Sequence, residues 1–168
     1  MTIRAVQAGD LPAINDIYNH YVRETSITFD YEPWTIEQRE AWLEKLINSE
    51  GYYHVLVKEN EHGEVIGFAY NGEFREKQAY KVSSEITIYL RHEVRAKGLG
   101  SALMEALLNK MLSSPVSRAY SVITLPNPAS IKLHEKFGFQ QVGLLTDVGY
   151  KFDQYYSVAI LEKSINNN

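Results

Sequence analysis

The chain has 168 residues, of which 45% are hydrophobic and 23% charged, with a formal net charge of -4 and no cysteine. This balance predicts one soluble globular domain over residues 1–165, with 166–168 as a frayed tail. The absence of cysteine excludes disulfides, thiolate catalysis and cysteine-ligated zinc, and no metal site is predicted. The mild net acidity argues against a nucleic-acid-binding face. No apolar run is long enough to span a membrane and no signal sequence opens the chain, so we expect no membrane partner and a cytoplasmic location.

The first half of the chain predicts a strand, two amphipathic helices and then three strands. A strand over Thr2–Val6 precedes a helix that Asp10 caps, with Pro12 in its first turn. Thr35 and Gln38 have the spacing of a capping box, which begins the second helix. The three strands are expected over Tyr53–Lys58, Glu64–Glu73 and Ser84–Leu90.

The second half alternates helices with strands. Apolar residues at helical spacing predict a helix over Leu99–Met111, and a further helix over Pro128–Lys136 ends at Gly138. The strands are expected over Arg118–Thr124, Phe139–Leu145 and Tyr155–Leu161. The order β-α-α-β-β-β-α-β-α-β-β predicts an α/β protein built around one mixed sheet.

A glycine-rich turn, Arg95-Ala-Lys-Gly98-Leu-Gly100-Ser101, joins the strand Ser84–Leu90 to the helix that follows. Such a turn exposes the first backbone N–H groups of a helix, which have no partner inside the helix and bind anions with the help of the helix dipole. Arg91, Arg95 and Lys97 add positive charge there. The turn therefore predicts a phosphate-bearing ligand; the alternative is an ordinary helix start with solvated basic side chains.

Two common phosphate-binding patterns do not fit this turn. The Walker spacing is absent, and a dinucleotide pattern starting at Gly98 needs a small residue where Leu103 lies. It also needs an acidic residue about 20 positions further on, but residues 114–128 contain no Asp or Glu. The spacing that fits, Arg95-x-x-Gly98-x-Gly100 after a strand, resembles the pyrophosphate loop of the GNAT acetyltransferase superfamily. The predicted element order is also that of the GNAT fold, a mixed central sheet with helices on both faces.

The GNAT resemblance implies how acetyl-CoA, as co-substrate, is held. The end of the strand, at Ile88, Tyr89 and Leu90, is expected to pair with the pantetheine arm like an added strand. The pyrophosphate is expected at the turn, whose residues are Arg95, Ala96, Lys97, Gly98, Leu99, Gly100 and Ser101.

The segment from Asn127 to Phe139 resembles a second GNAT signature, in which an Asn opens a helix and the segment ends in Gly-Phe. Asn127, Ser130 and His134 fall on one helical face. The resemblance implies that Asn127 and Ser130 contact the coenzyme and that His134 lies near its sulfur, where many relatives have Tyr. The alternative is a solvated helix face with Asn127 acting only as a cap.

Several separated strings narrow the resemblance. They include Ile17-Tyr-Asn-His-Tyr-Val22, Phe29-Asp-Tyr-Glu-Pro33, Glu85-Ile-Thr-Ile-Tyr89 and Gly149-Tyr-Lys151. Together they resemble the phosphinothricin (amino-acid sulfone and sulfoximine) N-acetyltransferase family, almost from end to end. The chain departs from that family at Ser157, where most members have Asp, and at residues 81–84, which are more polar here. Both departures fall where the acceptor is expected.

Glu85 is the candidate general base. Transfer to an amine requires removal of a proton from an ammonium group whose pKa is about 7.7–8.0. A carboxylate on a central strand is rarely there for packing, and burial would raise its pKa toward that of a general base. Glu85 shares its strand face with Thr87, so both are assigned to the acceptor site. An ion pair with a nearby Lys or Arg is the alternative.

His134 is the second catalytic candidate, as proton donor to the thiolate or as a group that orients the sulfur, against a purely structural role. Arg75 lies in the loop before Glu85, a region that contacts substrate in the family, and a guanidinium suits an amino-acid carboxylate. A solvated loop Arg is the alternative. Phe29 is expected in the pocket wall, with Tyr31 and the tyrosines at 150, 155 and 156.

The sequence thus predicts acetyl transfer from acetyl-CoA to the α-amine of a small amino-acid-like acceptor of the phosphinothricin, methionine sulfoximine or sulfone type, by direct attack on the thioester. Two alternatives stay open. One is a protein or peptide N-acetyltransferase, which the polar residues 81–84 favour. The other is a non-catalytic acyl-CoA-binding module, against which Glu85 and His134 argue. A homodimer is expected.

Overall fold

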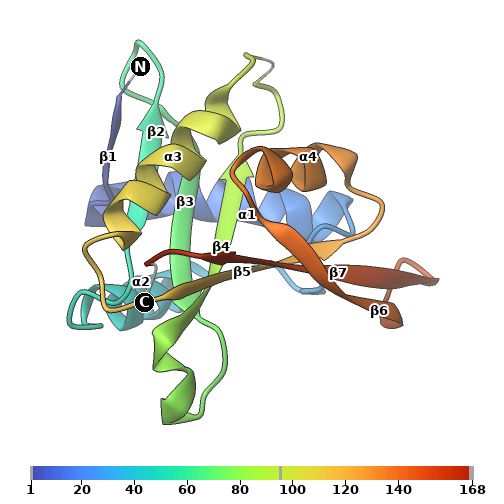
Figure 1. Cartoon of the computed structure of the whole chain (residues 1–168). Helices are drawn as coiled ribbons and strands as arrows, with labels where there is room; N and C mark the ends of the chain where they lie inside the picture. Colours follow the sequence, from blue (N-terminus) through green and yellow to red (C-terminus); the bar gives the residue numbers. More distant parts are fainter. Residues whose placement is uncertain (1, 95, 167–168) are drawn as a thin grey trace.

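The structure is a computed structural model that describes residues 2–94 and 96–166, and the described strands form one seven-stranded sheet (Figure 1). The strand order is β1-β2-β3-β4-β5-β7-β6, and only β4 and β5 are parallel neighbours. The strands are β1 (Ile3–Ala5), β2 (Val55–Glu59), β3 (Val65–Glu73), β4 (Ser83–Leu90), β5 (Arg118–Thr124), β6 (Gln140–Lys151) and β7 (Gln154–Ser164). The helices are α1 (Leu11–Glu24), α2 (Ile36–Ile47), α3 (Leu99–Met111) and α4 (Pro128–Lys136), with short 3-10 helices η1 (Ala8–Asp10) and η2 (Gln78–Val82).

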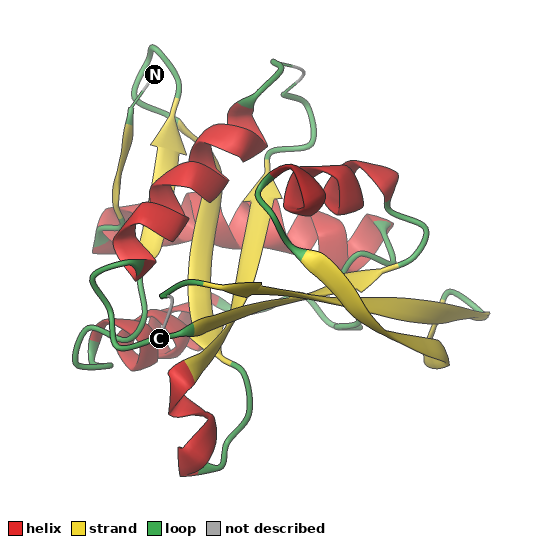
Figure 2. Cartoon of the chain, viewed as in Figure 1, coloured by secondary structure: helices red, strands yellow, loops and turns green. Residues whose placement is uncertain are grey.

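Helices cover both faces of the sheet, so the predicted fold class is confirmed (Figure 2). On one face, α3 buries Leu103 and Leu107 against Ile86 of β4. On the other face, α1 and α2 bury Ile14 and Leu43 against Phe68 of β3. None of the helices in the described ranges has the length and apolar character that crossing a membrane requires.

The start of α1 differs from the prediction. Asp10 does not cap the helix, because its side chain accepts no hydrogen bond from the first turn. Its carboxylate instead accepts the Gln7 N–H at 2.7 Å and two hydrogen bonds from the Arg4 guanidinium, at 2.7 and 2.9 Å. Arg4 also binds Glu59 of β2 at 2.6 Å. Asp10 therefore links η1 to β1 through Arg4, and the prediction that Asp10 caps α1 was wrong.

The closing hairpin is longer than predicted. We expected strands that stop at Leu145 and resume at Tyr155, but β6 continues to Lys151 and β7 runs from Gln154 to Ser164. The pairing register shifts between Leu145 and Gly149, and the ladder then resumes. Asp147 in this bulge has a φ of 50°, and its N–H donates to the Ser157 hydroxyl at 3.1 Å. Ser157 therefore supports the bulge that lets the hairpin extend.

Strands β4 and β5 diverge, and this divergence positions the site (Figure 1). Their parallel pairing includes Ser83↔Arg118, Ser84↔Ala119 and Glu85↔Tyr120. No further β4–β5 pair is found in the described residues, whereas β4 stays paired with β3 as far as Leu90. The two strands thus form a fork that closes at Glu85 and opens toward Leu90.

Candidate active site

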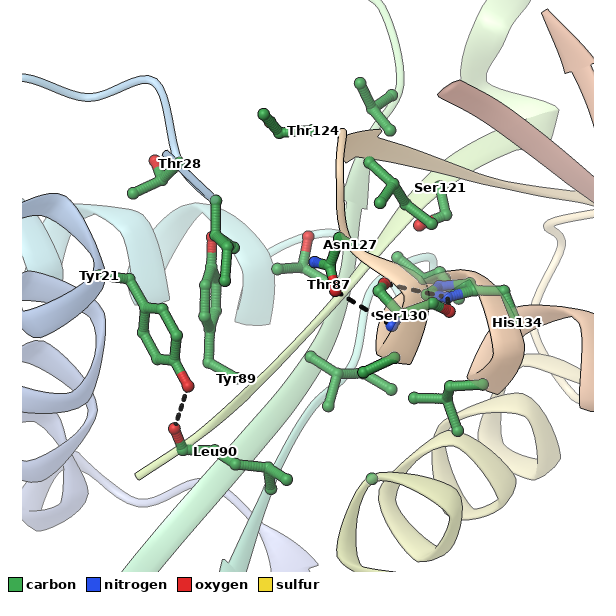
Figure 3. A pocket seen from close by; sticks show the side chains of 18 of the residues that line it. Tyr21, Thr28, Thr87, Tyr89, Leu90, Ser121, Thr124, Asn127, Ser130 and His134 are labelled. Atoms are coloured by element: carbon green, nitrogen blue, oxygen red, sulfur yellow. Dashed lines mark hydrogen bonds between the residues drawn. The ribbon is translucent and has the colours of Figure 1, made fainter. Parts of the chain in front are cut away.

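A cavity of about 660 Å³ occupies the fork between β4 and β5. Its wall comes from β3, β4, β5 and β7, from α1 and the loop after it, from the start of α3, and from α4 with the residue before it (Figure 3). The predicted site residues that line it are Phe29, Glu85, Thr87, Ile88, Tyr89, Leu90, Gly98, Gly100, Ser101, Asn127, Ser130 and His134. The cavity therefore brings together the glycine-rich turn before α3 and the segment that begins at Asn127, which α3 and β5 separate in the chain.

Tyr31 and the tyrosines at 150, 155 and 156 were expected in the pocket wall but do not line the cavity. Ala96, Lys97 and Leu99 belong to the same turn as the lining glycines but are not part of the cavity wall. Arg95 lies outside the described residues. Arg75 is exposed and stacks on Phe74 and Tyr80, with its guanidinium carbon 5.3 and 5.8 Å from the two ring centroids.

The open edge of β4 presents unpaired backbone groups to the cavity. The Arg91 N–H donates to the Ile66 carbonyl at 2.8 Å, which fixes the alternation of the β3–β4 ladder. Residues Leu90, Ile88 and Ile86 therefore point their N–H and C=O groups away from β3 and toward the fork. The Tyr21 hydroxyl, on α1, donates to the Leu90 carbonyl at 2.7 Å and closes the far end of this edge (Figure 3). The edge can pair with an extended ligand that carries amides.

The start of α3 is built to accept an anion. Gly98 is the N-cap with a φ of 82°, a left-handed conformation that favours glycine, and no side chain caps this helix. The first intrahelical bond runs from the Ala102 N–H to the Gly98 carbonyl at 3.0 Å. The N–H groups of the three residues before Ala102 precede that bond and are available to a ligand. The Lys136 ammonium donates to the Ser101 hydroxyl at 3.0 Å, which adds positive charge at the same place.

Glu85 lies at the closed end of the fork and is partly buried. Burial raises the pKa of its carboxyl group above the ordinary value. No ion pair to Glu85 occurs within residues 2–94 and 96–166. Tyr70 and Thr87 lie beside it on the same face of the sheet. A carboxylate that is desolvated and not neutralised by a cation is suited to accept a proton.

His134 is held by the helix that carries it. The Asn127 side chain accepts the Ser130 N–H at 3.2 Å and so begins α4 as a helix cap. One turn later, His134 Nδ1 lies 2.8 Å from the Ser130 carbonyl oxygen (Figure 3). A carbonyl only accepts, so Nδ1 carries the proton and Nε2 of the neutral ring has a free lone pair. Nε2 is buried and has no partner among the described residues, and burial lowers the pKa of the imidazole.

We expect His134 to be neutral at pH 7, with its proton on Nδ1. Long-range ¹H–¹⁵N spectra of labelled protein should show an unprotonated Nε2, and the ring should titrate below the ordinary value of about 6.5. Exposed His62 provides the matched control in the same spectra. A protonated Nε2 at pH 7 would contradict this assignment.

Sequence reasoning missed part of the cavity wall. Tyr18 and Tyr21 line the cavity from α1, and Thr28 lines it from the loop after α1. The two tyrosines continue the apolar stripe of α1, so their spacing alone does not distinguish them from core residues. The Tyr18 hydroxyl bonds the Thr28 hydroxyl at 2.9 Å and also donates to Asp30. The sequence feature that could have identified these two tyrosines as site residues is their hydroxyl groups, because an apolar stripe that only packs in the core does not need hydroxyl groups.

Comparison with known proteins gives one consistent family. Residues 3–160 match the family model of the acetyltransferase (GNAT) domain. A phosphinothricin N-acetyltransferase of Streptomyces coelicolor is 40% identical over 156 residues, which cover 93% of this chain and 91% of that protein. An L-methionine sulfoximine/L-methionine sulfone acetyltransferase of Pseudomonas aeruginosa is 30% identical over 165 residues, with 98% and 95% covered.

A solved structure agrees with this result. The GNAT superfamily phosphinothricin acetyltransferase from Sinorhizobium meliloti, solved in complex with AcCoA, superposes with a TM-score of 0.92. It is 31% identical, and the match covers 97% of this chain and 87% of that one.

Proposed function

The chain belongs to the GNAT acetyltransferase family, and on this premise we propose that it transfers the acetyl group of acetyl-CoA to the α-amine of a small amino-acid-like acceptor. The observation that carries the proposal is the fork, which has an open strand edge and an uncapped helix start toward its open end and, at its closed end, a partly buried carboxylate without an ion pair among the described residues. The names of the relatives support an acceptor of the phosphinothricin or methionine sulfoximine type.

In this proposal the coenzyme extends along the fork. The pantetheine amides pair with the open edge of β4 at Ile88–Leu90, and the pyrophosphate accepts hydrogen bonds from backbone N–H groups between Ala96 and Ser101. Asn127 and Ser130 on α4 line the opposite wall. This arrangement fixes the thioester relative to Glu85. Positioning of this kind contributes on the order of 7–11 kcal/mol at best to lowering the barrier.

The chemistry then needs one proton transfer before attack. Glu85 accepts a proton from the acceptor's ammonium group, directly or through one water molecule. The free amine attacks the thioester carbon, a C–N bond forms, and a backbone N–H at the open edge of β4 stabilises the oxyanion. The nitrogen, positively charged after attack, then loses its second proton as the C–S bond breaks, and the coenzyme leaves as a thiolate that takes up a proton to give the free thiol.

His134 is proposed to shape the coenzyme side of the cavity wall and not to protonate the leaving thiolate. Nδ1–H is committed to the Ser130 carbonyl, so Nε2 of the neutral ring carries only a lone pair and has no proton to give. A thiol leaving group has a pKa near 8.5 and needs no strong acid. The proton that the thiolate takes up therefore comes from solvent or from the amine nitrogen.

Recognition of the acceptor is proposed to involve Phe29, Thr87 and Arg75. None of the described residues in the cavity wall is Lys or Arg, so a cation for the acceptor carboxylate has to come from outside the wall. Arg75 stacks on Phe74, which stacks in turn on Tyr120 with ring centroids 4.3 Å apart. Tyr120 is the partner of Glu85 at the closed end of the fork. The stacked rings of Phe74 and Tyr120 thus connect Arg75 to the strand pair at Glu85, which supports a role for Arg75 in binding the acceptor.

Release of free thiol from acetyl-CoA tests the function. Phosphinothricin, methionine sulfoximine and methionine sulfone should each be compared with the common amino acids, with short peptides and with no acceptor. Turnover with the first group is the expected result. Faster turnover with peptides would establish a peptide acetyltransferase instead. Coenzyme binding without any thiol release would indicate an acyl-CoA-binding module.

The hairpin β6–β7 supports the proposal of a homodimer. Its exposed apolar side chains are Val142, Leu144, Leu145, Val148, Tyr150, Phe152 and Tyr155. This number of exposed apolar side chains on one hairpin favours a surface that a partner covers, and β6 is a sheet edge. Sedimentation equilibrium should give twice the mass of the chain, and Leu144→Glu should shift it toward the monomer. A monomeric wild-type protein at micromolar concentration would refute the proposal.

A further inference from the structure

Lys151 is a buried lysine with an unusual set of partners. It lies at the end of β6 and is 4% exposed. Its ammonium group donates to the backbone carbonyls of Val22, Thr25 and Thr28, each at 2.8 Å. An ammonium has three N–H groups, so all its donors have partners and the charged form suits the site.

The three carbonyls belong to one continuous stretch of chain. Val22 is in the last turn of α1, Thr25 is the residue that ends that helix, and Thr28 is in the loop beyond. Carbonyls at a helix C-terminus lack partners within the helix and carry partial negative charge. Lys151 therefore satisfies the end of α1 and holds the loop that follows it.

Further contacts join the same loop to the same hairpin. The Tyr31 hydroxyl donates to the Tyr150 carbonyl. The Phe29 ring packs so closely on Gly149 that a Cβ there would lie 2.2 Å from it. On the inner side, the loop is bound through the Tyr18 hydroxyl. The loop is thus fixed between α1 and the hairpin, and its residues Ile27, Thr28 and Phe29 form part of the cavity wall.

We propose that Lys151 is a positioning residue for the acceptor. Its ammonium fastens the Thr28–Phe29 wall of the cavity to the tip of the β6–β7 hairpin, so the shape of the acceptor pocket depends on a lysine that does not line the cavity. The inference rests on the proposed transferase function. It extends that function because, within the described residues, the coenzyme side of the fork on α3 and α4 forms no hydrogen bond with Lys151 and should be unaffected.

Lysine is specifically required by this geometry. Methionine has a similar length and fills the same space but leaves three carbonyls without a donor, which is costly in a buried place. Glutamine retains a single amide group with two N–H donors and no charge. Arginine keeps the charge but brings a planar, longer group that does not match three converging carbonyls.

The test compares Lys151→Met and Lys151→Gln with Lys58→Met. Lys58 in β2 is similarly buried, 6% exposed, and does not line the cavity. We expect Lys151→Met to raise KM for the acceptor about tenfold or more, with the Kd for acetyl-CoA unchanged within about twofold and with Lys151→Gln intermediate. Amide hydrogen exchange over residues 25–31 should accelerate in both Lys151 variants and not in Lys58→Met.

The outcomes separate the inference from the function it rests on. A wild-type KM for the acceptor in either folded Lys151 variant would overturn the inference, as would equal losses of affinity for acceptor and acetyl-CoA. If Lys151→Met does not fold, Lys151→Gln decides by the same two measurements. Failure of the proposed function would appear differently, as absence of thiol release by the wild-type protein with every acceptor. In that case unchanged exchange over residues 25–31 would still refute the anchoring role of Lys151.

Discussion

Glu85→Gln is expected to lower kcat by about 10²–10⁴-fold, the usual contribution of a general base. Glutamine preserves the shape of the side chain but does not accept the ammonium proton. The Kd for acetyl-CoA should stay within about twofold of wild type, because the open edge of β4 and the start of α3 are untouched. Glu76→Gln, in the exposed loop before η2, is the matched control. A wild-type rate in Glu85→Gln would remove Glu85 from the mechanism.

Glu85→Gln is also expected to change how the stability of the protein depends on pH. Burial raises the pKa of Glu85 in the folded protein above its unfolded value of about 4.5. The folded state therefore binds more protons than the unfolded state in the window between the two pKa values, and stability falls as the pH rises through it. Above that window the buried charge destabilises the fold. Glu85→Gln should accordingly be more stable than wild type at pH 7 and lose this advantage below about pH 4. Parallel melting curves of the two proteins across this range measure the difference.

The pH profile of wild-type activity should show an acidic limb that reports the ionisation of Glu85. Since only the ionised carboxylate accepts a proton, kcat/KM should fall as the pH drops through the raised pKa of Glu85. In Glu85→Gln the residual rate should no longer show that limb. A limb that persists unchanged would identify another base.

Gly100→Val is expected to raise the Kd for acetyl-CoA about 100-fold, which corresponds to ~2.7 kcal/mol. Gly100 lines the cavity in the first turn of α3, and a Cβ there would lie 3.3 Å from a methyl group of Leu133. A branched side chain would fill the space in front of the N–H groups that the pyrophosphate needs. Gly100→Ala should give a smaller increase in the Kd.

Titration calorimetry measures this effect, and melting curves show whether the variant is folded. Gly9→Val is the control, because a Cβ at Gly9 meets no atom within 4 Å and the residue lies away from the cavity. Wild-type affinity in a folded Gly100→Val protein would mean that the diphosphate binds elsewhere.

Much of the fold could be predicted because local signals agreed with the final packing. The bounds of α3, β5 and α4 were predicted to the residue. Gly98 precedes α3, Pro128 begins α4 and Gly138 follows it. The hairpin was underestimated because the bulge at Asp147 interrupts the strand pattern. The Asp10 cap was wrong because the Arg4 guanidinium and the Gln7 N–H bind its carboxylate. Both errors arise from contacts that a local pattern does not contain.

The site was predictable where its residues follow a period. Glu85 and Thr87 share a strand face, and Ser130 and His134 share a helix face, so the sequence grouped each pair correctly. It did not show that β4 and β5 part after Glu85, because that divergence depends on how whole layers pack. Nor did it assign a role to Lys151, whose partners are backbone carbonyls more than 100 positions away. The roles of the predicted site residues stay predictions until the variants are measured.

The brevity of the β4–β5 pairing has a consequence for the life of the protein in a cell. The two halves of the sheet share few backbone hydrogen bonds along this seam, so it is the natural line along which the molecule would begin to open. Acetyl-CoA bound between β4 and β5 would contact both halves of the sheet and hold them together. At 100 times its dissociation constant, such a ligand adds about 2.7 kcal/mol to stability. Resistance to proteases would then follow the supply of acyl donor, and a simple melting assay would rank acyl-CoA derivatives by their affinity for the protein.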